Sequence, residues 1–384
     1  MAYAFAATMI GTTLPTPLYG LYRQRFGFSE LMITVIFATY ALGVIAALLL
    51  FGRLSDEVGR RRALLPGLGL SALSAVAFLL AHGLGLLLLG RALSGLSAGI
   101  FTGTATATLV DLAPAQQRGR ATLIATMANM GGLGCGPLLA GVLSQLAGSP
   151  LRLSFWVDLA LLVPAAIGVW AMPEPVAVRE HPRLRPQVPR VPVEVRSTFT
   201  RAAIAGFAGF AVLGLFTAVA PAFLGQVLGV RSHAVVGLVV FAVFAASTAG
   251  QLALGWVREP LALPVGCGGL IAGMALLALG LASSSLAVLL LGGVLAGFGQ
   301  GLSFRAGLAA VNANSPPERR GEVASSFFVV AYVAISIPVV GEGILAQAAG
   351  LRAAGLAFAA GVAVLSAVVV APVAGAHQQE APRN

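Results

Sequence analysis

Runs of about twenty apolar residues, closed by Arg, Gly or Pro, recur along almost the whole chain. A helix needs roughly 20 apolar residues to cross a hydrocarbon core about 30 Å thick. Hydrophobic residues make up 58% of the 384 and charged residues 9%, whereas a soluble domain carries about 25% charged residues. Too few charges remain to cover a water-facing surface, so the solvent around most of this chain is a lipid bilayer.

The breaks between the runs predict an all-α membrane protein with twelve transmembrane helices in two pseudo-symmetric six-helix halves. The expected spans are 1–22, 30–51, 63–82, 84–111, 121–146, 153–172, 200–225, 233–256, 261–281, 285–310, 322–346 and 352–373. A stretch rich in Pro and Arg follows the sixth span. It has few apolar side chains that could be buried, and this composition indicates a solvated linker. The expected parts are an N-terminal half (1–172), a cytoplasmic linker (173–199), a C-terminal half (200–373) and a cytoplasmic tail (374–384).

The positive charges predict the orientation. All 23 basic residues are Arg; sixteen fall in loops on the side of the N-terminus and five in loops on the other side. Cytoplasmic loops carry the excess of positive charge, so we expect a multi-pass protein of the cell (inner or plasma) membrane with both termini in the cytoplasm. Because no basic, aromatic-interleaved domain lies outside the spans, nucleic acid is not expected as a partner. Whether the first residue truncates a longer N-terminus stays open.

An internal repeat supports the two halves. The segment from Leu89 aligns without a gap with the segment from Leu291, so that Gly95 meets Gly297 and Arg118 meets Arg320. Two parallel six-span repeats typically form a substrate cavity at their interface near the midplane, and rocking of one repeat against the other gives alternating access.

The loop after the second span reads GRLSDEVGRRR, from Gly52 to Arg62. It resembles the signature loop of the major facilitator superfamily, G-x-L-x-D-x-x-G-R-R/K. The resemblance implies a conformational latch formed by Gly52, Asp56, Gly59, Arg60 and Arg61. The alternative is an ordinary inside-positive loop with a solubilising Asp.

The fourth span contains LLLLGRALSGLSAG, which resembles the second motif of the same family. Arg91 lies seven residues into this span, about 10 Å below its outer edge. An Arg at that depth is costly unless it faces the bundle interior or snorkels. Arg91 is therefore a candidate for a coupling residue, and an Arg91 that snorkels to the interface is the alternative. The other candidates for coupling residues are Asp158 and Asp56.

The fifth span contains MGGLGCGPLLAG, with Gly132, Gly136, Pro137 and Gly141. This stretch resembles the antiporter motif of the twelve-span drug:proton antiporter (efflux) group, although the closing GG of the usual pattern is AG here. Pro removes one backbone donor and bends a helix. The resemblance implies export, with a kinked helix packed closely against the second half.

None of the thirteen acidic residues falls clearly at the midplane, and Glu342 is expected toward an outer end. The expected cavity is therefore neutral to mildly positive and suits amphipathic neutral or anionic compounds. Arg305 could instead snorkel at the inner edge. The predicted polar lining is Thr12, Thr13, Thr16, Tyr19, Thr217, Gln251, Gln300, Arg305 and Tyr332.

These patterns predict a monomeric secondary transporter for a small-molecule substrate and protons, most simply a multidrug or metabolite exporter. An uptake symporter for a sugar or organic acid is the alternative within this fold, and a polytopic membrane enzyme or a non-transporting receptor is the alternative of another class. Cys135, Cys267 and the four His residues stand apart from one another, and no Walker loop occurs. We therefore expect no enzymatic activity, catalytic residue, metal or cofactor.

Overall fold

The structure is a computed structural model. It describes the chain except for residues 53, 147–148, 177, 179–188 and 380–384, and it describes no side chain from residue 372 onward. In the part of the chain that it describes, every regular element is helical. Eleven helices in that part are long and apolar enough to cross a membrane. The predicted all-α membrane fold is confirmed. The linker at 173–199 and the tail at 374–384 lie partly outside the described residues.

The first span completes the predicted twelve, and two prolines divide it. It consists of α1 (Ala2–Thr13), the 3-10 turn η1 (Thr16–Leu18) and α2 (Tyr19–Phe26). Pro15 and Pro17 have no N–H group to donate, so the α-helical hydrogen bonding is interrupted there. The span ends at Phe26 rather than at the expected residue 22.

The remaining helices follow the predicted order, and their ends differ from the expected limits by a few residues. They are α3 (Glu30–Phe51), α4 (Leu54–Val58), α5 (Arg60–Leu79), α6 (Leu84–Asp111), η2 (Ala115–Gln117), α7 (Arg118–Leu146), α8 (Pro150–Trp170), η3 (Val193–Val195), α9 (Arg196–Ala218), α10 (Ala220–Ala222), η4 (Phe223–Val227), α11 (His233–Ala253), α12 (Glu259–Ala282), α13 (Leu286–Asn314), η5 (Pro317–Arg319), α14 (Arg320–Ala334), α15 (Ile337–Ala349) and α16 (Leu351–Gln379). The eleventh span is split into α14 and α15 just before Pro338.

The chain forms two compact units. One consists of Met1–Pro189 with Thr217–Phe244, and the other of Arg190–Phe216 with Ala245–Asn384. The sequence repeat assigns residues 217–244 to the second half, whereas in space they pack with the first. The division of the chain into halves at the linker stays a prediction.

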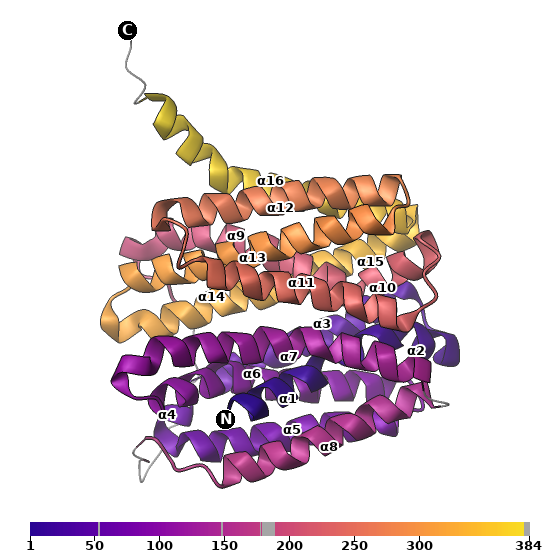
Figure 1. Ribbon diagram of the computed structural model, residues 1–384, viewed down its shortest axis with the longest axis horizontal. Coiled ribbons are helices and arrows are strands. Elements are labelled where there is room, and N and C mark those ends of the chain that lie inside the picture. Colours follow the sequence, from indigo (N-terminus) through magenta and orange to yellow (C-terminus); the bar gives the residue numbers. More distant parts are fainter. Residues whose placement is uncertain (53, 147–148, 177, 179–188, 380–384) are drawn as a thin grey trace. The chain divides into compact units, whose positions relative to one another are not determined.

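In the first unit, α6 packs on α3, α5, α7 and α1, and α8 packs on α5 and α1 (Figure 1). Glycines allow the closest of these approaches. A Cβ atom on Gly95 would clash with the Tyr40 carbonyl, and one on Gly99 would lie 2.8 Å from the Val44 carbonyl oxygen. Small residues let transmembrane helix backbones approach in this way, so the glycine face of α6 serves packing against α3.

In the second unit, α12 packs along α13 and α16. A Cβ atom on Gly266 would lie 2.6 Å from the Ser303 backbone nitrogen, and one on Gly299 2.5 Å from the Gly266 carbonyl oxygen. In each unit, glycines therefore allow the backbones of a pair of helices to approach closely.

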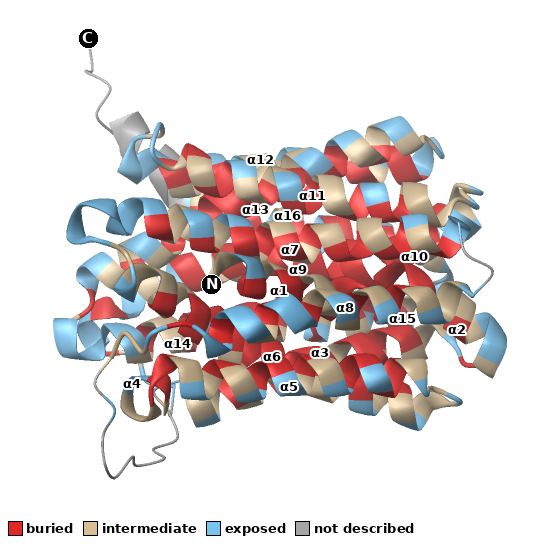
Figure 2. Cartoon of the chain, turned by 60° about the horizontal axis from the view of Figure 1, so that its bottom comes forward, coloured by how far each residue is buried: buried red, intermediate tan, exposed pale blue. Residues whose placement is uncertain are grey.

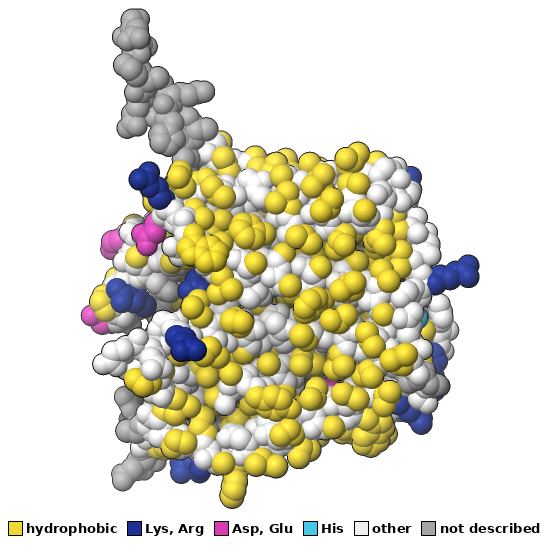
Figure 3. Space-filling model, in the orientation of Figure 1, with side chains coloured by type: hydrophobic (Ala, Val, Ile, Leu, Met, Phe, Trp, Pro, Cys, Tyr) yellow, Lys and Arg dark blue, Asp and Glu magenta, His cyan; other side chains and the backbone are white. Residues whose placement is uncertain are grey.

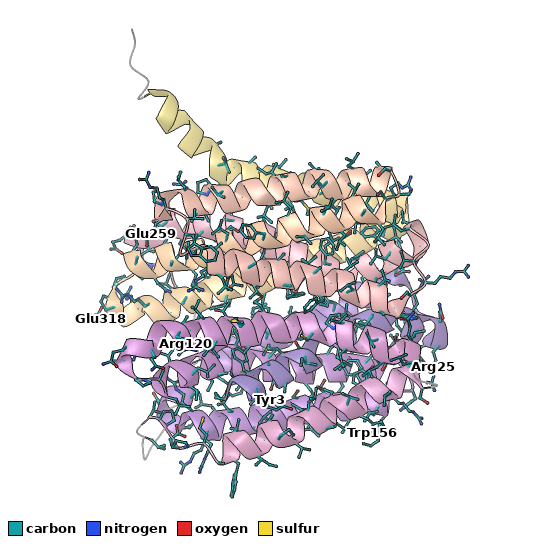
Figure 4. All side chains as sticks on the ribbon, in the orientation of Figure 1. Tyr3, Arg25, Arg120, Trp156, Glu259 and Glu318 are labelled. Carbon is teal, nitrogen blue, oxygen red and sulfur yellow. The ribbon has the colours of Figure 1, made fainter. Side chains whose placement is uncertain are left out.

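Burial separates the two faces of the helices. Buried residues gather where helices meet, and exposed residues lie on outward faces and connections (Figure 2). The outward surface in Figure 3 is mostly apolar, with charged side chains near the helix ends. Trp156 is 60% exposed on α8, and Arg25 and Arg120 lie at opposite ends of the first unit (Figure 4). This distribution is typical of a membrane protein.

Candidate functional site

The predicted latch loop is organised by Arg60. Its Nη1 donates to Ser55 Oγ at 2.8 Å and lies 2.5 Å from Asp56 Oδ1, and its Nε donates to Asp111 Oδ2 at 3.0 Å. The Asp56 side chain is 55% exposed, whereas that of Arg60 is 10% exposed. An exposed i,i+4 pair contributes only about 0.3–0.5 kcal/mol. The buried end of the guanidinium, which ties α5 to the end of α6, is therefore the firmer contact.

Glu174 caps the start of α5. Its carboxylate accepts the Arg60 N–H at 2.7 Å and the Arg61 N–H at 3.0 Å. An anion at a helix N-terminus is stabilised by the free N–H groups and the helix dipole. Gly59 has φ +101°, and a Cβ there would lie 2.6 Å from Glu174 Oε2. Glycine is thus required at 59 both for the backbone conformation and for the approach of the carboxylate.

Arg91 lies inside the first unit rather than at its lipid edge. Arg91 is only 1% exposed. Its Nε donates to the Tyr19 hydroxyl, and its Nη1 donates to the Thr12 carbonyl oxygen at 2.5 Å. The guanidinium carbon lies within 6.0 Å of four aromatic rings, those of Tyr19, Phe37, Tyr40 and Phe78. Cation–π contacts and the carbonyl stabilise the charge. Among the described residues, no carboxylate pairs with it.

Asp158 is the buried acid of the first unit. The residue is 2% exposed on α8, and its Oδ1 has no hydrogen-bond partner among the described residues. A Cβ atom on Gly11 of α1 would lie 2.8 Å from each carboxylate oxygen. Asp158 and Arg91 therefore contact neighbouring residues of α1, Gly11 and Thr12, from α8 and α6.

The antiporter-like stretch of α7 uses two faces. Gly132 and Gly136 face α1, where added Cβ atoms would lie 2.7 Å from the Ala6 carbonyl oxygen and 2.5 Å from the Ile10 carbonyl oxygen. Pro137 and Gly141 face the start of α11, where their backbones approach Gly237 and His233. A helix with so few side chains lets both neighbours come close.

A cavity of about 770 Å³ lies in the first unit, lined by α2, the start of α3 and residues 218–236. Its volume falls in the roughly 300–1,000 Å³ range of small-molecule sites. Arg23 and Gln226 both donate to Glu30 in its wall. Arg231 also lines it, and so does Tyr19, which joins the cavity to Arg91.

The other predicted cavity residues of the first unit are buried in contacts. The Thr12 hydroxyl donates to the Met9 carbonyl at 2.8 Å, and that of Thr13 donates to the Leu133 carbonyl on α7 at 2.7 Å. The Thr16 hydroxyl has no partner among the described residues. Thr217 is 3% exposed near the end of α9.

In the second unit, Gln251 and Gln300 lie at one crossing of α11 and α13. The Ser247 hydroxyl donates to Gln300 Oε1 at 2.5 Å, and the Nε2 groups of both glutamines have no partner among the described residues. The half-buried Arg305 also has an unpartnered Nη1. Tyr332 packs edge-on against Phe210, with ring centroids 6.3 Å apart.

Sequence reasoning did not single out Glu174 and Asp111. The sequence indicates only that both lie on the same side of the membrane as the basic loop. Their roles depend on which span ends meet Arg60, and a single sequence does not carry that.

Comparison with known proteins places the sequence of this chain in a family. The family model described as Major Facilitator Superfamily matches residues 1–279. A triacylglyceride transporter of Mycolicibacterium smegmatis is 32% identical over 160 residues, which cover 40% of this chain and 27% of that protein. Multidrug resistance protein MdtL of Escherichia coli is 33% identical over 131 residues, which cover 33% of this chain and 32% of that protein. The matches thus span about a third or less of these relatives.

Solved structures share the fold along the chain. A bacterial homolog of the human lysosomal transporter Spinster, in an inward-facing and occupied conformation, has a TM-score of 0.73 at 16% identity and covers 96% of this chain and 94% of its own. The human organic anion transporter MFSD10 has a TM-score of 0.68 at 17% identity, covering 96% and 97%. The resemblance to this family, expected from the sequence, is confirmed. The chain belongs to the Major Facilitator Superfamily.

Proposed function

We propose that this transporter exports neutral or anionic amphipathic compounds in exchange for protons, by alternating access. It acts as a monomer in the cell (inner or plasma) membrane, with both termini in the cytoplasm. The observation that carries the proposal is Asp158, a buried carboxyl group without a partner for Oδ1 among the described residues, lying against α1 of the first unit.

Asp158 is suited to carry the proton. An ionised carboxylate in a low-dielectric interior is costly unless it is paired or hydrogen-bonded, and binding a proton removes that cost. Ionisable groups inside membrane spans commonly mark proton relays. Arg91 provides a positive charge at the adjacent residue of α1. That charge stabilises the carboxylate whenever α1 and its neighbours shift to let the proton leave.

The substrate class follows from charge and size. The wall of the cavity of about 770 Å³ contains Arg23 and Arg231, and Glu30 is the one acid among the described residues that line it. Such a wall disfavours polycations and accepts neutral or anionic groups, and Tyr19 provides an aromatic surface. The relatives named as a triacylglyceride transporter and a multidrug resistance protein support an apolar or amphipathic substrate.

Export rather than uptake is supported by the resemblance of the stretch of α7 from Gly132 to Gly141 to the antiporter motif. Its Pro137 and Gly141 approach α11, whose first part packs with the first unit although the repeat assigns it to the second half. Movement at this contact would open and close one end of the protein. The Asp56–Arg60–Asp111 contacts at the basic loop would hold the other end in register.

The test is flux in proteoliposomes with an imposed pH gradient. The panel is radiolabelled chloramphenicol as a neutral amphipath, carboxyfluorescein as an anion and tetraphenylphosphonium as a lipophilic cation. We expect the gradient to drive the neutral or anionic compound against the direction of proton movement. Flux that ignores the gradient rejects proton coupling, and flux in the direction of the protons identifies an uptake symporter.

Asp158→Asn separates coupling from binding, because the amide is similar in size and cannot carry a proton. We expect gradient-driven flux to be lost while downhill exchange of the same compound persists. Glu318→Gln, at an exposed residue of η5, is the matched control and should behave as the unmodified protein. Full gradient-driven flux in Asp158→Asn would refute the role of this carboxyl group.

A further inference from the structure

A second buried acid, Glu342 on α15, lies outside the transport machinery described above. The residue is 3% exposed, and both of its carboxylate oxygens lack a hydrogen-bond partner among the described residues. It lies seven residues before the end of α15, about 10 Å from that end at 1.5 Å per residue. An ionisable side chain at this depth in a membrane span costs free energy, and such residues are read as functional sites.

Glu342 is one of the residues that line an apolar pocket within the second unit. The pocket has a volume of about 240 Å³ between α9, α15 and α16. Val339, one turn before Glu342, is anchored on α9, because a Cβ atom on Gly214 would lie 2.8 Å from the Val339 side chain. Glu342 is thereby turned toward Ala211 and Phe207, the preceding turns of α9, and the wall from α16 includes Phe358 and Val362.

Two glycines leave the pocket open at the surface of the second unit. Gly341 on α15 and Gly361 on α16 line it, are exposed, and would have no atom within 4 Å of an added Cβ. The exposed neighbours on the same helices are apolar, with Ile344 55% and Val364 63% exposed. An apolar molecule that reaches this surface can therefore enter the pocket that Glu342 lines.

We propose that this pocket binds lipophilic amines that enter from the bilayer, with the ammonium group on Glu342 and the apolar body against Phe207 and Phe358. An ammonium group supplies donors to both orphan oxygens in charge-assisted hydrogen bonds. A metal ion would need several oxygen ligands, and no group of three acidic, His or Cys residues occurs in the described part of the chain. The pocket is smaller than the roughly 300–1,000 Å³ of drug-sized sites, so it holds a small amine or one end of a longer one.

This site is independent of proton coupling at Asp158 and is tested by binding alone. The probe pair is 4-phenylbutylamine and 4-phenylbutanol, which share one apolar body and differ in the charged donor. Binding is measured by calorimetry on the full chain in phosphatidylcholine nanodiscs, with empty nanodiscs subtracted. We expect the amine to bind at least about tenfold more tightly than the alcohol, and Glu342→Gln to remove this preference.

Gly361→Leu decides the outcome if Glu342→Gln does not fold. It places a side chain at the mouth of the pocket and leaves the carboxyl group intact, so amine binding should fall at least about tenfold. Gly168→Leu, at an exposed glycine of α8 with no atom within 4 Å, is the matched control and should bind the amine normally.

Two results would overturn the proposal. One is an amine preference that survives Glu342→Gln in the folded protein, and the other is unchanged amine binding in Gly361→Leu. If the preference survives in Glu342→Gln and all gradient-driven flux is lost, Glu342 is a proton site instead.

Discussion

Replacing Gly136 by Ala tests the contact between α7 and α1 most sharply. The new Cβ would lie 2.5 Å from the Ile10 carbonyl oxygen and 3.0 Å from the Leu14 nitrogen, and against the Thr13 hydroxyl. Backbone atoms cannot move aside cheaply, so overpacking costs about 1–3 kcal/mol. Loss of the Thr13–Leu133 hydrogen bond adds about 0.5–1.5 kcal/mol. The higher helix propensity of Ala offsets about 0.5–1 kcal/mol, which leaves a net destabilisation of about 0.5–4 kcal/mol.

Gly131→Ala is the matched control on the same helix, because a Cβ there would meet no atom within 4 Å. It keeps the propensity gain without the clash, so it should be neutral or stabilising by up to about 1 kcal/mol. Thermal unfolding of the detergent-solubilised proteins, at one scan rate because unfolding of such proteins is commonly irreversible, measures the difference. We expect the Tm of Gly136→Ala to lie at least a few degrees below that of Gly131→Ala. Equal Tm values would refute the close approach of α7 to α1.

Three further predictions concern the charged groups. Asp56→Asn should slow gradient-driven flux several-fold yet insert normally, since Arg60 keeps Asp111; flux equal to that of the exposed-residue control Arg62→Gln would remove the latch role. Arg91→Lys should lose most flux and lower the Tm, because an ammonium cannot reproduce the planar contacts with Tyr19 and Thr12; full activity of the Lys variant would contradict this. Glu174→Gln should cost about 1 kcal/mol at the start of α5, seen as a lower Tm than that of Glu194→Gln, and an unchanged Tm would exclude the cap.

The spans and their order could be predicted because the bilayer imposes a length and a polarity on every helix. Interruptions of the spans were visible only as prolines. Pro15, Pro17 and Pro338 fall where the first and eleventh spans divide, but their effect on helix ends depends on local backbone geometry. The end of α2 at Phe26 followed from the turn at Gly27, whose φ is +69°, and no hydropathy limit records such a turn.

The candidate site was predictable where a residue is costly by its depth alone. Arg91 is such a residue, since a cation within a span needs partners wherever they come from. The sequence indicates only that Glu342 lies toward an outer end. Its burial depends on the splitting of α14 from α15 and on the neighbouring α9 and α16, which the sequence does not show. Thr12 and Thr13 illustrate another limit: the sequence does not show that their hydroxyls donate to nearby carbonyls, as Ser and Thr in helices often do.

The central claim, exchange of substrate for protons, is tested most directly by letting the substrate drive the protons. Proteoliposomes are loaded with the panel compound that is transported fastest and diluted into compound-free buffer, with no imposed pH gradient and with a pH dye in the lumen. Because coupling is reciprocal, we predict that the lumen acidifies as the compound leaves, and that liposomes with Asp158→Asn do not acidify. A lumen that becomes alkaline would show symport, and a constant pH during substrate efflux would contradict proton coupling altogether.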